Sequence, residues 1–235
     1  EKLKLAYKWV YKTHGEAYVV KVDLDTFVRV AEVENFVNDR QIKYECIVGG
    51  ISQGDVLRNG KWAENKYKKD KYPPFPYGSG HIVSPDLLKY IVTHEMVTYQ
   101  GEDTSLGIFF DESDIDVTFT VTKSIITHSG DCFNKKAMII GHNIDVSKMK
   151  KCYGSAASVD SVDSVDSVDS VDSATISGKT IRFKAPLMKS SDIVVGILSY
   201  KKEKRDILRN YMQNWGTSNY FVIGKKNGFY DETEF

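Results

Sequence analysis

The alternation of hydrophobic and polar positions predicts an α/β chain. Residues 1–14 carry apolar side chains at helical spacing, and residues 18–22, YVVKV, are types suited to a strand buried on both faces. The apolar run at 192–200 is typical of a buried parallel strand. Residues 201–215 show helical spacing again, and residues 219–224 predict a further strand. Strand, helix and strand in this order open a doubly wound α/β sheet.

A repeated tract divides the chain. The segment from Ser158 to Ser173 repeats Ser-Val-Asp five times, with a period of three that matches neither a helix nor a strand. We interpret the segment at 158–173 as a low-complexity linker. It joins a long part, residues 1–157, to a shorter part, residues 174–235, and we expect both parts to belong to one domain.

The composition narrows the class of protein. With 235 residues and 41% hydrophobic content, the chain can bury one substantial core. Its 32 basic and 32 acidic residues balance, which argues against a general nucleic-acid binder but allows a local phosphate site. The cysteines, Cys46, Cys132 and Cys152, are odd in number and widely spaced, so a disulfide framework or zinc site is not expected and at most one bridge can form. No apolar run approaches the length of a membrane-spanning helix, and no signal peptide is visible.

Two acids follow the first predicted strand. Asp23 and Asp25 are separated by Leu24 alone, which places them on the same side of an extended backbone. One interpretation is a polar turn after the strand. The other is a clamp for a divalent cation, because Mg²⁺ and Mn²⁺ bind one or two carboxylates and take further ligands from water and phosphates.

Three other stretches carry unusual chemistry. Residues 72–88, YPPFPYGSGHIVSPDLL, form a rigid glycine-lined turn and then enter a helix at Ser84 and Pro85. Such a turn often lets a ligand approach the backbone, and the alternative is an ordinary tight loop. Residues 100–110 place two acids before a predicted helix, where acids also serve as simple caps. Residues 135–144 end a hydrophobic strand with a histidine that is either structural or a ligand.

Read in circular order, these stretches resemble the family 31 glycosyltransferases, the β1,3-galactosyl- and N-acetylglucosaminyltransferase group with a GT-A fold. The family's first strand and helix resemble IVVGILSYKKEKRDILRNYMQNWG, and its second strand resembles NYFVIG. The helix and strand leading into its Asp-x-Asp motif resemble KLAYKWVYKTHGEAYVVKVDLDTFV. Its glycine-rich segment, its Glu-Asp-Val-x-x-Gly motif and its late strand ending in a metal-binding histidine resemble YPPFPYGSGHIVS, GEDTSLGIFF and KAMIIGHN.

The order of the motifs differs from that of the family, because the chain begins in the middle of the family's domain. A circular permutation explains this order if the family's termini lie close enough for the Ser-Val-Asp tract to bridge them. The resemblance therefore implies an α/β GT-A domain, a Rossmann-like mixed sheet with helices on both faces, in circularly permuted order. The motifs depart from the family in three places. The family has an acid where this chain has Leu24 and a valine where it has Thr104, and the helix after KKEKRDILR carries two extra residues before its tryptophan.

The resemblance also implies a chemistry. A hexosyltransferase of this family moves a sugar, with inversion, from a UDP-sugar donor to a hydroxyl of a glycan or glycoprotein acceptor. The resemblance implies that Asp23, Asp25 and His142 bind Mn²⁺ or Mg²⁺. It also implies that Asp103 is the catalytic base, with Glu102 as the second candidate. The implied residues that bind nucleotide and sugar are Asp23, Gly78, Ser79, Gly80, Tyr200, Lys204 and Arg205.

Two other classes of protein stay open. A nucleotide-sugar or glycan-binding module that has lost catalysis is one, although the presence of Asp25, Asp103 and His142 argues against it. An unrelated nucleotide-binding protein such as a dehydrogenase is the other, but it needs a glycine-rich turn after its first strand, and GILSYKKEK has none. We expect a soluble cytoplasmic enzyme, encoded by a microbe or a large virus, with the Golgi lumen and a removed anchor as the alternative.

Overall fold

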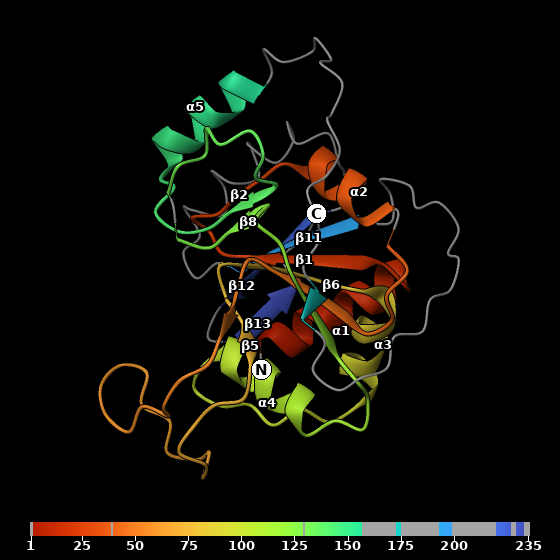
Figure 1. Cartoon of the computed structure of the whole chain (residues 1–235), viewed down its shortest axis with the longest axis vertical. Coiled ribbons are helices and arrows are strands. Elements are labelled where there is room, and N and C mark those ends of the chain that lie inside the picture. Colours follow the sequence, from red (N-terminus) through yellow and green to blue (C-terminus); the bar gives the residue numbers. More distant parts are fainter. Residues whose placement is uncertain are drawn as a thin grey trace.

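The central feature of the protein, in a computed structural model, is an eight-stranded mixed sheet (Figure 1). The structure describes residues 2–38, 40–128 and 130–156, and the backbone of four short ranges, 173–174, 193–198, 220–226 and 229–232. The strand order in the sheet is β10-β7-β3-β6-β1-β11-β12-β13. These strands are β1 (Tyr18–Val22), β3 (Glu45–Val48), β6 (Gly80–Val83), β7 (Thr118–Val121), β10 (Ser173–Ala174), β11 (Ile193–Leu198), β12 (Tyr220–Lys226) and β13 (Phe229–Glu232).

Strand β1 lies inside this sheet between two strands that are distant in sequence. It pairs antiparallel with β6, where Lys21 lies opposite His81, and parallel with β11, where Val22 lies opposite Ile197. Strand β11 in turn runs parallel to β12. The predicted parallel strand at 192–200 and the predicted strand at 219–224 are therefore confirmed, and both belong to the same sheet as β1.

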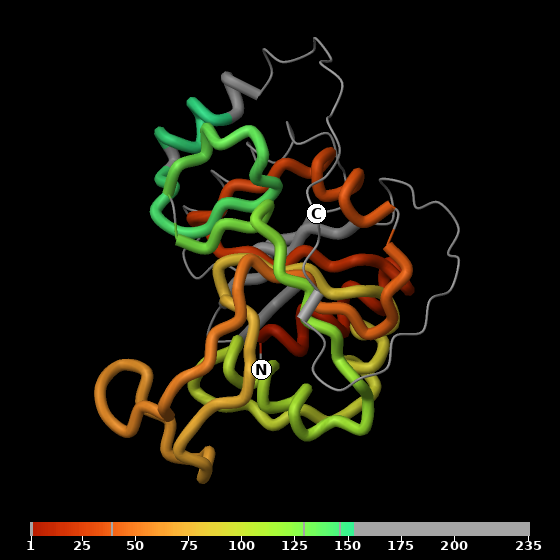
Figure 2. The backbone as a smooth tube through the Cα atoms, in the orientation of Figure 1, coloured from red at the N-terminus to blue at the C-terminus, as the bar shows by residue number. Residues whose placement is uncertain are grey.

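Layers of structure cover both faces of the sheet, as expected for the fold class. The helices α1 (Lys2–His14), α3 (Pro85–Thr93) and α4 (Glu102–Asp111) lie on one face. The other face carries α2 (Val30–Asn38), α5 (Val146–Ala156) and a small sheet of β2 (Phe27–Val28), β9 (Ile139–Ile140) and β8 (Ile125–Ile126). The paired strands β4 (Ile51–Ser52) and β5 (Phe75–Pro76) are joined by a segment that projects from the body, drawn in orange in Figure 2.

The alternation of side chains along β1 produces two separate hydrophobic cores. Val20 and Val22 pack with α2 and the small sheet, whereas Val19 packs with α1, α3 and α4. All five residues of the strand are buried, which confirms the prediction of a strand covered on both faces. Leu24, just beyond the strand, packs against the first of these cores.

Several local predictions are confirmed. The helix expected at residues 1–14 is α1, and the helix expected after the glycine-rich turn begins at Pro85 with Ser84 at its N-cap position. The Ser84 side chain does not cap the helix, because its Oγ accepts the Glu45 N–H at 3.0 Å and donates to Asp86 instead. The predicted helix at 201–215 lies outside the described residues, as does the Ser-Val-Asp tract up to residue 172, and Ser173 belongs to β10.

Within the part of the chain that the structure describes, no helix is long and apolar enough to cross a bilayer.

A disulfide joins Cys132 to Cys152, the single bridge that the cysteine count allowed. The two Cα atoms lie 5.8 Å apart, within the usual range, and Cys152 belongs to α5. The bridge closes a loop of 20 residues that contains β9 and His142. The third cysteine, Cys46, is free and buried in β3, where burial raises the pKa of its thiol.

We predict that Cys132→Ser lowers the free energy of unfolding by about 3 kcal/mol, because a cross-link over a loop of this length restricts the unfolded chain. Chemical denaturation of parent and variant, each without reductant, measures the difference. Cys46→Ser, at a buried cysteine outside the bridge, measures the cost of the cysteine-to-serine change itself. A reducing agent should lower the stability of the parent but not that of Cys132→Ser.

Candidate active site and metal centre

The two acids after β1 lie in a turn. The Thr26 N–H donates to the Asp23 carbonyl oxygen at 3.2 Å, which closes the turn around Leu24 and Asp25. The prediction of an extended backbone for Asp-Leu-Asp is therefore wrong. The chain reversal, together with the packing of Leu24 into the core, is what presents both carboxylates on one side.

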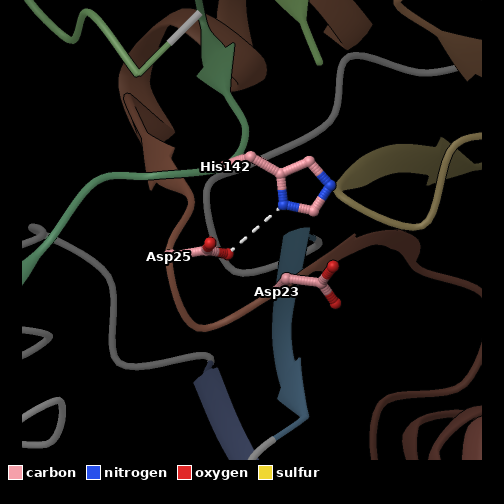
Figure 3. Close-up of side chains that lie close together, drawn as sticks. All are labelled: Asp23, Asp25 and His142. Atoms are coloured by element: carbon pink, nitrogen blue, oxygen red, sulfur yellow. Dashed lines mark ion pairs between the residues drawn. The ribbon is translucent and has the colours of Figure 1, made fainter. Parts of the chain in front are cut away.

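Asp23, Asp25 and His142 form a cluster of three potential metal ligands (Figure 3). One ligand atom from each lies within 4.8 Å of the other two. Figure 3 shows the Asp25 carboxylate facing the His142 ring, and Asp25 Oδ1 lies 3.6 Å from His142 Nδ1. All three residues are half-buried, so a ligand can reach them from solvent.

The backbone that follows His142 holds Asp25 in place. The Asn143 N–H donates to Asp25 Oδ2 at 3.1 Å, and the Ile144 N–H donates to the Asp25 carbonyl oxygen at 3.3 Å. These contacts connect residues more than a hundred positions apart. They fix the first turn of the site against the loop that follows β9.

The loop that carries His142 has an unusual backbone. His142 and Asn143 both adopt left-handed conformations, with φ of 61° and 63°, which are uncommon for residues other than glycine. Such conformations persist where surrounding contacts determine them, and they concentrate at functional sites. Gly141 allows the loop to approach the glycine-rich turn, because a Cβ at this position would lie 2.6 Å from the Cβ of Ser79.

A second histidine lies beside the first. The rings of His128 and His142 stack with centroids 5.4 Å apart, and Tyr77 packs edge-on against His128 at 5.1 Å. Among the described residues, His142 and not His128 belongs to the three-residue cluster. The stack restrains the orientation of the His142 ring.

The glycine-rich turn connects β5 to β6 and contacts both sides of the site. Thr26 Oγ1 donates to the Ser79 carbonyl oxygen at 2.8 Å, which attaches the turn to the acid-bearing segment. A Cβ on Gly78 would lie 3.6 Å from Asp103 Oδ2 and equally far from Lys21 Nζ. The turn therefore lies between the acids that follow β1 and those at the start of α4.

Glu102 and Asp103 occupy the first turn of α4 rather than the segment before it. Glu102 Oε1 lies 2.7 Å from Lys21 Nζ. Burial by itself would raise the pKa of Glu102, but the Lys21 ammonium outweighs this effect and lowers it. Asp103 makes no ion pair with any described residue, and burial raises the pKa of its carboxyl despite the Thr104 N–H that donates to Asp103 Oδ1 at 2.9 Å.

Lys21 belongs to the site although the sequence pattern did not single it out. It lies in β1 with 2% of its surface exposed, and its ammonium donates to Asp23 Oδ1 at 2.9 Å and to the carbonyl oxygen of Gly78. Burial by itself would lower the pKa of Lys21, but Glu102 and Asp23 outweigh it and raise the pKa. The signal that could have revealed it is a lysine flanked by valines within a strand predicted to be buried on both faces.

A second buried polar residue, His81, holds the beginning of the glycine-rich turn. His81 is fully buried beside Lys21, and burial, reinforced by the Lys21 charge, lowers its pKa to about 4. The neutral ring donates from Nδ1 to the Tyr77 carbonyl oxygen at 3.2 Å and accepts the Tyr7 hydroxyl at Nε2, 3.1 Å away. This chain of contacts joins α1 to the beginning of the glycine-rich turn.

The structure thus brings together eight of the predicted site residues around one turn: Asp23, Asp25, Gly78, Ser79, Gly80, Glu102, Asp103 and His142. The remaining three, Tyr200, Lys204 and Arg205, lie outside the described residues.

The donor set of the cluster fits a hard or borderline divalent cation. Two carboxylates and one imidazole suit Mn²⁺, and two carboxylates suit Mg²⁺. Three protein ligands leave coordination positions for water or phosphate oxygens. The half-buried position of the ligands and the absence of a thiolate among them favour such an ion over a structural zinc.

Comparison with known proteins shows what the chain is similar to. It is 33% identical over 112 residues to the UDP-GalNAc:beta-1,3-N-acetylgalactosaminyltransferase 2 of Xenopus laevis, a stretch that covers 46% of this chain and 23% of that protein. The protein of the same name from Homo sapiens is 32% identical over 112 residues, which cover 46% of this chain and 22% of the human protein. The hydroxyproline O-galactosyltransferase GALT2 of Arabidopsis thaliana is 29% identical over 102 residues, covering 40% and 15% respectively.

The aligned stretches span less than a quarter of the length of these relatives. A family model described as galactosyltransferase matches residues 2–120, which include the turn after β1, the glycine-rich turn and the start of α4. Since this match extends over half of the 235 residues, the chain belongs to the galactosyltransferase family.

Proposed function

We propose that the protein is a glycosyltransferase that moves a hexose from a UDP-sugar to a hydroxyl of a glycan or glycoprotein acceptor, with inversion at the anomeric carbon. One observation carries this proposal: a cluster of cation ligands and a separate aspartate, which makes no ion pair with any described residue, flank the same glycine-rich turn. The names of the relatives, which describe sugar transfer from UDP-GalNAc and galactosyl transfer to hydroxyproline, support the reaction class.

The donor side of the proposed reaction belongs to the cluster of Asp23, Asp25 and His142. These side chains would hold Mn²⁺ or Mg²⁺, which when bound neutralises the charge of a leaving diphosphate. The backbone contacts of Asp25 with the loop that follows β9 keep the ligand set arranged before a donor binds. Preorganised ligands of this kind stabilise a developing charge without reorganising during the reaction.

The acceptor side belongs to Asp103. In the proposed step the acceptor oxygen forms a bond to the anomeric carbon while the bond to the nucleoside diphosphate breaks, and the electron pair of that bond leaves with the diphosphate. Asp103 takes the proton of the acceptor hydroxyl. Its raised pKa makes it a stronger base than an ordinary aspartate, whereas Glu102 is held as an ion by Lys21 and is the poorer candidate.

The assignment of a circularly permuted GT-A fold is part of the same proposal. In a GT-A domain of permuted order, β11 and β12 would supply the nucleotide-binding half. Their parallel pairing beside β1 supports this assignment, as does the register that sets the end of β11 next to the end of β1. Nucleotides bind in such sheets at the carboxyl ends of parallel strands, which is the edge where the Asp23 to Thr26 turn begins.

A binding module without catalysis is the second candidate. The ion pair between Lys21 and Glu102 is compatible with either function, but a half-buried aspartate with a raised pKa, outside any described ion pair, favours catalysis. Transfer activity separates the two candidates directly.

The metal site gives the first functional prediction. Asp25→Asn keeps the size of the side chain and an oxygen that can accept the Asn143 N–H, but it removes the charge that faces His142. We expect the affinity for Mn²⁺ alone to fall by more than about 100-fold, the upper range for loss of a group that merely supports a ligand. Electron paramagnetic resonance of free Mn²⁺ measures this affinity.

Asp70→Asn is the matched control, because Asp70 is a fully exposed carboxylate in the projecting segment. It should bind Mn²⁺ as the parent does. If Asp25→Asn also binds Mn²⁺ at parent affinity, the acids after β1 are a polar turn and not a metal site.

The base gives the second functional prediction. Asp103→Asn retains the volume and an oxygen acceptor for the Thr104 N–H while removing the basic carboxylate. We expect normal folding and donor binding, with sugar transfer from UDP-sugars reduced by about 10² to 10⁴, the usual worth of general-base assistance. Single-turnover transfer to a glycan acceptor, with donor and Mn²⁺ saturating, measures this step.

Asp111→Asn, at the opposite end of α4, is the control and should transfer sugar at the parent rate. Parent-like transfer by Asp103→Asn with a large loss in Glu102→Gln would assign the base to Glu102. A parent that transfers no sugar from any UDP-sugar would favour the binding module.

A further inference from the structure

The least expected residue of the site is the lysine buried in β1. We propose that Lys21 is a positioning residue that couples the metal-ligand cluster to the base-bearing end of α4, so that Glu102 serves as an anchor for Lys21. This inference rests on the proposed function and deepens it, because it assigns a role to each of two charged residues at the site.

The location of Lys21 makes an ordinary structural role a poor explanation. Its side chain is 3% exposed, in a strand whose four other residues are Tyr18, Val19, Val20 and Val22. By alternation it shares the face of Val19, which packs with α1, α3 and α4. A buried charge contributes little net stability, since replacement of a buried ion pair by packed apolar residues is often neutral or stabilising. With its carboxylate partners replaced as well, a methionine or leucine would serve the core equally well.

The contacts of Lys21 explain what the charge does. Its ammonium has three N–H donors, and it has three described acceptors: Asp23, Glu102 and the carbonyl oxygen of Gly78. These acceptors come from the turn after β1, from α4 and from the glycine-rich turn. Because each donor has a protein partner, the ammonium has none left for a substrate. Lys21 therefore acts through its partners, as a positioning residue.

The two carboxylates are the negative groups that neutralise this ammonium. His81, which lies opposite Lys21 in the sheet, is uncharged over the neutral pH range because burial and Lys21 lower its pKa to about 4. Asp23 is also a member of the metal-ligand cluster, whereas Glu102 directly precedes Asp103 in α4. One ammonium thus fixes the distance between the proposed metal site and the proposed base.

Loss of this connection should affect the chemistry more than the binding of ligands. A displacement of about 1 Å of a reacting group can lower a rate by about 10²-fold. We expect Lys21→Met to reduce kcat for sugar transfer by about 10²-fold, with KM for the UDP-sugar changed only a few-fold. Lys21→Arg keeps the positive charge and should retain more activity than Lys21→Met.

The affinity for Mn²⁺ alone distinguishes positioning from general damage to the site. Lys21→Met removes a cation that lies 2.9 Å from Asp23, so the charge of Asp23 becomes more available to a divalent ion. We expect Mn²⁺ binding to be retained or tightened while kcat falls. Lys89→Met is the matched control, since it breaks the exposed ion pair with Glu16 and should change neither quantity.

Thermal unfolding without metal or substrate supplies a readout independent of activity. Lys21→Met leaves the half-buried Glu102 without its cation, and Glu102→Gln removes the charge from the same contact although it keeps an oxygen for the lysine. Both single variants should therefore unfold at a lower temperature than the parent. The double variant should unfold at a higher temperature than the sum of the two shifts predicts, because the two changes remove one shared interaction. The milder Glu102→Gln variant also reports on kcat if Lys21→Met folds poorly.

Three outcomes would overturn the inference. They are parent-like kcat in folded Lys21→Met, parallel loss of Mn²⁺ binding and transfer in that variant, and strictly additive shifts in the unfolding temperature. A parent chain that neither binds Mn²⁺ nor transfers sugar would instead remove the proposed function itself, and with it the role assigned to Lys21.

Discussion

A positive charge enclosed by a protein core has to be neutralised, and in this protein that requirement determines how the site is assembled. The ammonium of Lys21 is surrounded by the sheet and the helices on one of its faces. Its neutralisation demands acceptors from neighbouring elements, and they come from three segments that are far apart in sequence. The glycine-rich turn, the turn after β1 and α4 therefore meet at a point that packing alone would not specify.

The two hydrophobic cores provide the rigid frame for this arrangement. Because β1 is covered on both faces and paired on both edges, the residues that follow it leave the sheet at a fixed position. Asp23 and Asp25 lie in the turn that begins there. Strongly buried strands commonly carry functional residues on the loops at their ends, since the scaffold positions such loops without constraining their chemistry.

The position of His142 depends more on long-range contacts than do the positions of Asp23 and Asp25. His142 lies in a loop whose left-handed backbone is held by Asp25, by the stacked ring of His128 and by close approach to Ser79. The same loop is enclosed by the disulfide between Cys132 and Cys152. Each restraint comes from a different segment. Together they hold an imidazole beside a carboxylate without a regular element to support it.

The sequence by itself determined the features that depend on neighbouring residues. Helical spacing identified α1, β-branched residues identified β1, and Ser84 followed by Pro85 identified the start of α3. The acids and the histidine of the candidate site were also visible as local patterns, and their resemblance to a family indicated that they belong together. These features are local because helix and strand preferences arise from side chains within a few positions of one another.

Only the tertiary structure decided how these residues meet. It replaced the expected extended Asp-Leu-Asp by a turn, paired two of three cysteines, and placed His142 beside Asp23 and Asp25. It also revealed Lys21, whose neighbours Gly78 and Glu102 lie far away in the sequence. Periodicity predicts that a strand residue is buried, but the identity of the atoms that surround it depends on which strands pair and which helices cover them. That information is carried by the fold.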